Sequence, residues 1–308
     1  MRTVFFGSPE EAVPSLKALL ACGHQVATVF TQPDRPAGRS AAPVPTPVKA
    51  AAERAGIPVR TPKTLRDPAV QAELRACGAD AFVVVAYGRM LPPEVLAIPR
   101  LGVLNVHPSL LPGFRGPSPV QQAILDGVDE TGVTVMLLDA GMDTGPVLSQ
   151  QRLRLNGNET AAALTARLFE MGARLLVDTL DRHGRGEAGP QPQDGAKATV
   201  TKLLSREDGE IDWSKTARQI ARRVRAYDPW PGTSTRWRGK TLKILEAQAV
   251  DERAGEPGMV SVRDGGLYIA AGEGSLRALR LQLEGRKAGT AEEFVRGHPQ
   301  AAGSSVPS

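Results

Sequence analysis

The chain has 308 residues, of which 41% are hydrophobic and 23% are charged, a composition that is typical of a globular protein and excludes global disorder. At about 100–200 residues per domain, this length predicts two domains. Basic residues outnumber acidic residues by 38 to 33, and the resulting net charge of +5 permits a polyanionic partner without requiring one.

Residues 1–150 alternate between short apolar runs and segments of helical composition. The runs predict strands at residues 3–6, 26–30, 81–86, 101–106 and 133–138, and the other segments predict helices at 10–21, 47–55, 68–76 and 117–125. This alternation is typical of a parallel sheet with crossover helices. Together with a long helix expected at residues 158–180, it predicts an α/β domain over residues 1–189, with a doubly wound, mostly parallel, Rossmann-like sheet.

After the long helix the composition becomes polar and rich in glycine and proline, which predicts a linker over residues 190–205. A second domain is expected over residues 206–308. It begins with a helix at 214–225, and short alternating strands follow at 234–238, 241–249, 258–262, 267–271 and 276–283. Five short antiparallel strands fit a small OB-fold-like β-barrel. Residues 301–308 are expected to be a frayed tail.

Several features bear on the compartment. Cys22 and Cys77 are the only cysteines, and their spacing matches neither a C-x-x-C motif nor a metal site. No run of about 18 apolar residues occurs, so no membrane-spanning helix is expected. The opening residues lack the charged and apolar regions of a secretory signal. We therefore expect a cytoplasmic monomer with two free thiols, no metal and no membrane partner.

Residues 184–189 match the dinucleotide-binding pattern G-x-G-x-x-G. That motif must follow a strand and open a helix, because the helix N-terminus meets the pyrophosphate. Here it follows a predicted helix and runs into Pro190. After the first predicted strand, Glu10 places an acid on the first turn of the next helix, which is unsuited to a phosphate. No NAD cofactor is therefore expected.

Two polar residues stand near the carboxyl end of a predicted strand. Asn105 and His107 are two residues apart, so their side chains point to the same face. The open edge above such strand ends is where α/β sheets bind ligands, and the proline- and glycine-rich residues 108–116 turn away from it. A lone histidine is more often a hydrogen-bonded structural residue, but this pairing makes a functional site an equal alternative.

A second candidate is the glycine-rich loop at residues 139–145, which contains Asp139 and Asp143 and follows a predicted strand. Its acids could suggest a calcium loop, but the EF-hand spacing and terminal glutamate are absent. An ordinary turn between strands is the other interpretation. Sequence spacing alone does not bring Asp143 to His107.

Taken together, these segments resemble a known family. Residues 105–112, 115–116 and 139–145 resemble the signatures of the folate-dependent formyltransferases, and the resemblance extends to residues 4–9, 32–39, 45–49 and 86–88. It covers essentially the whole chain. The Gly-Arg loop that ends at Arg39, together with the C-terminal barrel, points to the branch that acts on methionyl-tRNA.

The resemblance implies an activity and a set of site residues. The formyl group of 10-formyltetrahydrofolate would move to the α-amino group of methionine on initiator tRNA. The catalytic residues would be Asn105, His107 and Asp143. The folate contacts would be Ser109, Leu110, Leu111 and Pro112, with a pterin pocket completed near Tyr87, Gly88 and Asp139. Asn105 could donate to the oxyanion of a tetrahedral intermediate, His107 could donate to it or carry a proton, and Asp143 could orient His107.

The basic residues are unevenly distributed. Residues 215–243 contain nine basic residues and one acidic residue. Arg218, Arg222 and Arg225 fall on one face of the predicted helix, where an exposed stripe of like charge favours phosphate contact over a merely solvated face. The residues expected to contact tRNA are Arg35, Arg39, Lys49, Arg218, Arg222, Arg223, Arg225 and Lys240.

Three alternative functions compete with this interpretation. A related enzyme could formylate a small amine such as glycinamide ribonucleotide, but such a substrate needs neither the barrel nor the loop at Arg35–Arg39. An enzyme that hydrolyses or oxidises formyltetrahydrofolate would need a dehydrogenase domain for which the chain has no room. A non-catalytic tRNA-binding protein would leave Asn105, His107 and Asp143 without a role.

Overall fold

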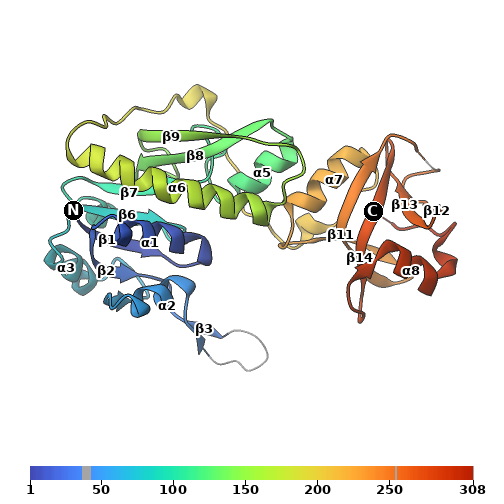
Figure 1. Cartoon of the computed structure of the whole chain (residues 1–308), viewed down its shortest axis with the longest axis horizontal. Helices are drawn as coiled ribbons and strands as arrows, with labels where there is room; N and C mark the ends of the chain where they lie inside the picture. The colour runs from blue at the N-terminus through green and yellow to red at the C-terminus, as the bar shows by residue number, and fades with distance from the viewer. Residues whose placement is uncertain (37–42, 254, 308) are drawn as a thin grey trace. The chain divides into compact units, whose positions relative to one another are not determined.

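The computed structural model describes residues 1–36, 43–253 and 255–307 (Figure 1). The chain divides into two compact units. The first consists of Met1–Pro119, Glu130–Arg154 and Thr165–Thr201, and the second of Val120–Asp129, Leu155–Leu164 and Lys202–Ser308. The division into a domain at residues 1–189, a linker at 190–205 and a domain at 206–308 remains a prediction.

The first unit is built on a seven-stranded sheet in the order β5-β2-β1-β6-β7-β8-β9. The strands are β1 (Arg2–Gly7), β2 (Gln25–Phe30), β5 (Val59–Arg60), β6 (Ala81–Val85), β7 (Val103–His107), β8 (Glu130–Leu137) and β9 (Val147–Arg154). The first five of these are parallel to one another, and β8 and β9 form an antiparallel hairpin in which β8 also pairs antiparallel with β7. The predicted α/β fold with a mostly parallel sheet is confirmed.

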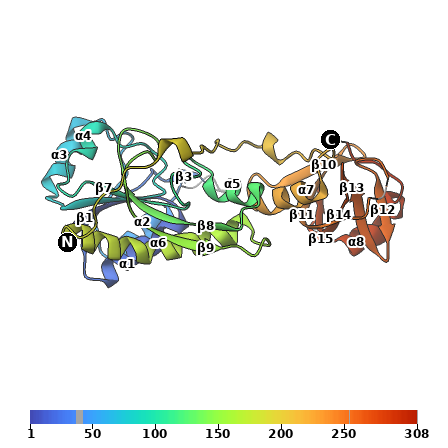
Figure 2. The same cartoon turned by 90° about the horizontal axis from the view of Figure 1, so that it is seen from above.

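Helices cover both faces of this sheet (Figure 2). They are α1 (Val13–Ala21), α2 (Pro47–Arg54), α3 (Pro68–Ala76), α4 (Pro93–Leu96) and α6 (Ala161–Gly184), whereas α5 (Pro119–Asp126) belongs, apart from Pro119, to the second unit. Apolar side chains of α1, α2 and α6 pack on one face, and those of α3 and α4 pack on the other. Proline begins α2, where its fixed φ suits a first helical turn, and Thr46 caps that helix by accepting a hydrogen bond from the backbone nitrogen of Lys49.

The two apolar layers decide which way the side chains of β7 point. Leu104 and Val106 pack into the layer beneath α1 and α6, whereas Val103 packs into the layer beneath α3 and α4. Because side chains alternate along a strand, Asn105 and His107 project from the same face as Val103. They lie further along β7, toward its carboxyl end.

The second unit contains an antiparallel sheet in the order β10-β11-β14-β13-β12, with β15 paired to β14. Its strands are β10 (Thr233–Trp237), β11 (Lys240–Val250), β12 (Val260–Arg263), β13 (Gly266–Ala270), β14 (Ser275–Leu283) and β15 (Gly289–Thr290). The predicted C-terminal β domain is thereby confirmed. Helices α7 (Ala217–Ala226) and α8 (Ala291–Gly297) pack on its core, which includes the fully buried Trp213.

The prediction of a frayed tail after residue 300 is wrong. The backbone of Val260 in β12 donates to the carbonyl of Ser304, and the backbone of Val306 donates to the carbonyl of Gly258. On the other edge strand, the hydroxyl of Thr235 in β10 donates to the carbonyl of Pro307. The segment therefore satisfies backbone and side-chain groups of both edge strands and buries Val306, which its glycine- and serine-rich composition did not indicate.

Within the residues that the structure describes, none of the helices combines the length and the apolar character needed to cross a membrane.

Candidate active site

The candidate site lies at the carboxyl end of β7. Asn105 pairs with Val84 of β6 on one side and with Met136 of β8 on the other, and His107 pairs with Thr134 of β8. Both side chains are largely buried, with 9% of Asn105 and 4% of His107 exposed. Neighbouring strands therefore fix the position of both residues.

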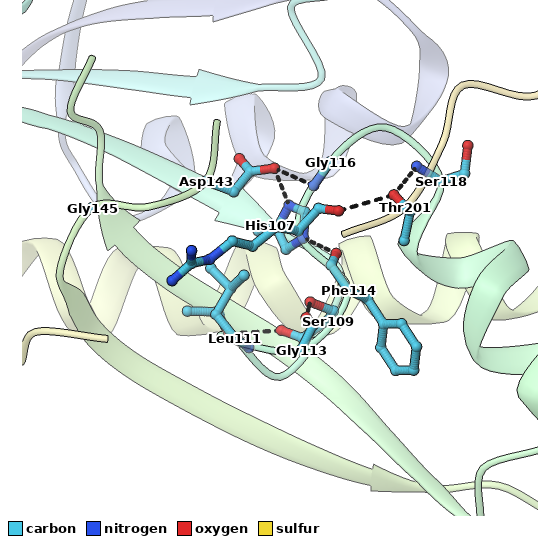
Figure 3. A network of polar contacts seen from close by, with 12 residues as sticks. His107, Ser109, Leu111, Gly113, Phe114, Gly116, Ser118, Asp143, Gly145 and Thr201 are labelled. Carbon is cyan, nitrogen blue, oxygen red and sulfur yellow. Dashed lines mark hydrogen bonds and ion pairs between the residues drawn. The ribbon is translucent and has the colours of Figure 1, made fainter. Parts of the chain in front are cut away.

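The structure brings Asp143 to His107, which sequence spacing could not do (Figure 3). The Oδ2 atom of Asp143 lies 3.6 Å from Nδ1 of His107 and accepts a hydrogen bond of 2.8 Å from the backbone nitrogen of Gly116. Asp143 has a φ of +54°, in the left-handed region where aspartate is enriched among residues other than glycine. The turn that contains Asp143 thus aims its carboxylate at the end of β7.

The other ring nitrogen of His107 fixes the tautomer. Nε2 lies 3.0 Å from the carbonyl oxygen of Phe114. Because a carbonyl oxygen can only accept, Nε2 carries the proton in this contact. Nδ1 is consequently the ring nitrogen that faces Asp143 and can exchange a proton.

The loop after β7 is held by the β8–β9 hairpin. The hydroxyl of Thr134 accepts from the backbone nitrogen of Leu111 and donates to the carbonyl of Ser109. The side-chain amide of Gln150 donates to the carbonyl of Leu111 and to the same hydroxyl. The Ser109 hydroxyl donates across the loop to the carbonyl of Gly113. Residues 109–113 are therefore rigid, with most of their polar groups satisfied inside the protein.

A distant segment holds the other side of the loop. The backbone nitrogen of Phe114 donates to the hydroxyl of Thr199, and that of Arg115 donates to the Thr199 carbonyl. The backbone nitrogen of Thr201 in turn donates to the carbonyl of Arg115. Both threonines lie in the segment predicted as a linker. Sequence reasoning missed them because no local pattern marks a polar residue that contacts a loop more than 80 positions away.

The residues expected to contact folate divide into two groups. The side chains of Tyr87, Ser109 and Leu111 are buried. Tyr87 packs against Phe6 with their ring centroids 5.4 Å apart, and burial raises the pKa of its phenol. Gly88, Leu110, Pro112 and Asp139 are more exposed. The buried members can shape a pocket, and the exposed members are available to line it.

The loop at Asp139 has the geometry of an ordinary turn. One carboxylate oxygen of Asp139 accepts from the backbone nitrogen of Gly141 at 3.0 Å and from the hydroxyl of Thr144 at 2.7 Å. This carboxylate oxygen closes the loop on itself, as in an Asx-turn. Within the described parts of the chain, no group of three or more histidine, cysteine, aspartate and glutamate side chains could hold a metal ion.

Three of the predicted tRNA contacts belong to the first unit. The ammonium of Lys49 lies 2.6 Å from Oδ2 of Asp34, and this hydrogen bond raises the pKa of Lys49 above its ordinary value. Arg35 lies in β3 (Arg35–Pro36), which pairs with β4 (Pro43–Val44). Arg39 lies outside the described residues. Lys49 therefore carries a charge that Asp34 partly neutralises.

The prediction that Arg218, Arg222 and Arg225 form an exposed stripe is wrong in part. Arg218 is exposed, and its guanidinium lies 3.0 Å from a carboxylate oxygen of Asp251. Arg222 and Arg225 are half-buried, and Arg222 donates to the carbonyl of Asp126 at 3.4 Å. Burial lowers the pKa of Arg225, with the charge of Arg222 acting in the same direction. Helical spacing predicts on which face of the helix each residue lies, but it does not predict which residues pack against that face.

Arg223 is also engaged within the protein. Its guanidinium donates to the carbonyl of Asp208 and lies 5.4 Å from the ring centroid of Tyr227. By contrast, Lys240 and Lys243 of β11 are exposed. The exposed basic side chains of β11 are therefore better placed to contact a polyanion than the arginines of α7.

Comparison with known proteins identifies the family. The Formyl transferase family model matches residues 1–180, and the model described as Formyl transferase, C-terminal domain, matches residues 203–299. The methionyl-tRNA formyltransferase of Roseiflexus sp. (strain RS-1) is 52% identical over 300 residues, which cover 96% of this chain and 92% of that protein. The methionyl-tRNA formyltransferase of Roseiflexus castenholzii is 51% identical, with 96% of each chain covered.

Solved structures give the same fold. The N-formyltransferase of Helicobacter canadensis, solved in complex with folinic acid and dTDP-3-aminofucose, matches with a TM-score of 0.69 at 20% identity, over 90% of this chain and 98% of that chain. With both family models matched and about half of its residues shared with relatives of similar length, the chain belongs to the formyl transferase family, in its methionyl-tRNA formyltransferase branch.

Proposed function

We propose that the protein transfers the formyl group of 10-formyltetrahydrofolate to the α-amino group of methionine esterified to initiator tRNA. The observation that carries this proposal is the 3.6 Å approach of Asp143 to His107 at the end of β7, two residues after Asn105. The names of the relatives support the tRNA substrate, and family membership supports a folate-type formyl donor.

Asn105 would stabilise the oxyanion. The neutral amine of methionine attacks the formyl carbon, and negative charge develops on the formyl oxygen of the tetrahedral intermediate. The Asn105 side-chain amide can donate a hydrogen bond to that oxygen, and a donor of this kind is worth about 2.7–4 kcal/mol in comparable sites. Its buried position on a central strand would hold the donor in place.

His107 and Asp143 would manage the proton. Since Nε2 donates to the carbonyl of Phe114, Nδ1 is the nitrogen that would take the proton released by the attacking amine and pass it to the leaving nitrogen of the folate. Asp143 would stabilise the charged ring formed in between, as acids do beside catalytic histidines. The proposal needs neither a metal nor a covalent intermediate.

The folate would lie over the loop after β7. In this proposal Leu110, Pro112, Gly88 and Asp139 contact the ligand, while Ser109, Leu111 and Tyr87 shape the pocket from below. The internal hydrogen bonds of residues 109–113 support this division, because a prearranged loop loses little conformational entropy when a ligand binds.

The tRNA would be held by basic residues of both units. We assign Arg35, Arg39 and Lys49 to the acceptor end, and Arg218, Arg222, Arg225 and Lys240 to the phosphate backbone. Arg223 was expected there too, but its contacts with Asp208 and Tyr227 favour a structural role. The exposure of Lys240 supports its role most directly. The cytoplasmic location, the monomeric state and the domain boundaries at residues 189 and 205 remain parts of this proposal.

A substrate comparison tests the proposed function. The protein is incubated with 10-formyltetrahydrofolate and, in separate reactions, with methionyl initiator tRNA, methionyl elongator tRNA and glycinamide ribonucleotide. Formylation confined to the initiator tRNA is expected. Formylation of the ribonucleotide, or equal formylation of both tRNAs, would contradict the proposal.

A further inference from the structure

We propose that Gln193 is a positioning residue that sets the geometry of the His107–Asp143 pair. The inference rests on the proposed function, since it assumes that this pair acts in formyl transfer. Gln193 lies in the segment predicted to be a linker, and no sequence pattern marks it.

The side chain of Gln193 holds the loop that carries Asp143. Its Nε2 atom donates to the carbonyl oxygen of Asp143 at 2.8 Å and to that of Gly145 at 2.7 Å. Asp143 occupies the left-handed region, with a φ of +54°, and a hydrogen bond to its own carbonyl restrains the following peptide. On the far side the loop packs so closely on β8 that a Cβ atom at Gly145 would lie 1.9 Å from the carbonyl oxygen of Leu137. The loop is therefore fixed from two directions.

The same side chain also holds the segment that contacts both members of the pair. Its Oε1 atom accepts from Nε of Arg115 at 3.0 Å and from Nη2 at 2.8 Å. Arg115 lies between Phe114, whose carbonyl accepts from His107, and Gly116, whose nitrogen donates to the Asp143 carboxylate. One amide thus joins the loop that carries Asp143 to the turn that orients His107.

Only an amide of this length serves both contacts. A glutamine amide has two N–H donors and an oxygen with two lone pairs, and here both donors and both lone pairs are used within the protein. No capacity is left for a direct bond to substrate. Gln193 therefore acts through Asp143 and Arg115, and it is not itself a catalytic residue.

The segment around Gln193 is anchored independently of this side chain. The backbone of Gln191 exchanges two hydrogen bonds of 2.8 Å with the backbone of Val147 in β9, and Thr199 and Thr201 pair with the loop after β7. Replacing the Gln193 side chain should therefore leave the segment in place and loosen only the Asp143 loop and Arg115.

The test compares Gln193→Leu, which removes all four hydrogen bonds, with Gln193→Glu, which keeps an acceptor for Arg115 but loses both donors. Gln191→Leu is the matched control, because the Gln191 side chain is exposed. The single-turnover rate of formyl transfer, the KM values for both substrates and the unfolding temperature are measured. A displacement of about 1 Å in a reacting group can cost about 100-fold, so both Gln193 variants should lose about 10- to 100-fold in rate with KM values within about twofold of wild type. Gln191→Leu should match wild type.

A double variant separates positioning from general damage to the fold. If Gln193 acts through Asp143, then Gln193→Leu combined with Asp143→Asn should be no slower than Asp143→Asn alone. Multiplied losses would overturn the inference, and so would a wild-type rate in either Gln193 variant. If Gln193→Leu does not fold, the same comparison of single and double variants is made with Gln193→Glu. Failure of both Gln193 variants to fold would also overturn the inference. A wild-type rate in Asp143→Asn would instead refute the proposed role of the pair itself.

Discussion

His107 and Asp143 are held together by two peptide groups of one short turn. The carbonyl of Phe114 accepts from Nε2 of His107, and the nitrogen of Gly116, two residues later, donates to the Asp143 carboxylate. The distance of 3.6 Å between Nδ1 and Oδ2 is therefore a property of this turn as much as of the two side chains. A change that loosens the turn should act on the pair even where it touches neither residue.

Thr134 supports the loop that leads into this turn. Its buried hydroxyl forms hydrogen bonds with Leu111, Ser109 and Gln150, so Thr134→Val should leave buried polar groups without a hydrogen-bond partner. We expect the free energy of unfolding to fall by about 1–3 kcal/mol, with a slower single-turnover rate. Chemical denaturation and a formylation assay measure the two effects.

Thr131 provides the control for that substitution. It lies in the same strand, is 2% exposed, and its hydroxyl has no hydrogen-bond partner among the residues that the structure describes. Thr131→Val should therefore leave stability unchanged or raise it. A loss equal to that of Thr134→Val would show that the hydroxyl contacts of Thr134 are not the cause.

The exposed lysines of β11 should contribute to tRNA affinity. The double variant Lys240→Gln and Lys243→Gln should bind tRNA more weakly and reduce the slope of log K against log salt by about 2, since each phosphate contact contributes about 1. Its unfolding temperature should not change. Binding measured across a salt series checks the predicted slope. An unchanged slope would show that these lysines do not contact the RNA.

Arg223 should behave in the opposite way. Because its guanidinium donates to the carbonyl of Asp208, Arg223→Gln should lower the free energy of unfolding by about 1–3 kcal/mol. Thermal denaturation measures this effect. A variant that is as stable as wild type but binds tRNA more weakly would contradict this structural role and support the tRNA contact that the sequence predicted.

Val306 tests the role of the last residues in the second unit. It is 2% exposed, and Val306→Ala removes two buried methyl groups at about 0.8 kcal/mol each, so a loss of roughly 2 kcal/mol is expected. Exposed Ala302 offers a control, since Ala302→Ser should have no effect. Equal stability of both variants would contradict the ordered tail.

His24 should make stability depend on pH. Burial lowers its pKa below the ordinary value of 6.5. The unfolded chain therefore binds a proton at His24 more readily than the folded protein does. The contribution of His24 to the free energy of unfolding is complete above pH 6.5 and is lost as the pH falls, by at most about 1.4 kcal/mol per pH unit. Between pH 7.5 and 5.5, His24→Gln should lose less stability than wild type. Parallel losses in the two proteins would refute this.

The sequence predicted the fold where the physical signal was local. Apolar runs between helical segments predicted the parallel strands, whereas β9 was missed because it is an edge strand whose residues are mostly polar. Helix α8 was missed because it has only seven residues, although its capping box at Thr290 and Glu293 was a usable signal.

The site was predictable only in part for the same reason. The period of a strand placed Asn105 and His107 on one face. The approach of Asp143, and the contacts of Thr134, Gln193 and Thr199, depend on segments distant in the sequence, and no spacing encodes them. The arginines of α7 show the converse, because helical spacing predicted their faces but could not anticipate the carbonyl groups of Asp126 and Asp208 that engage them.

The most direct test of the catalytic assignment is the single-turnover rate of formyl transfer to methionyl initiator tRNA by Asn105→Ala and Asp143→Asn. The unfolding temperature of each variant is measured in parallel to show that it is folded. We predict that Asn105→Ala is slower by about 100- to 1,000-fold, the loss expected for one oxyanion donor, and that Asp143→Asn is also strongly slowed. Rates within a few-fold of wild type in the folded variants would contradict the account.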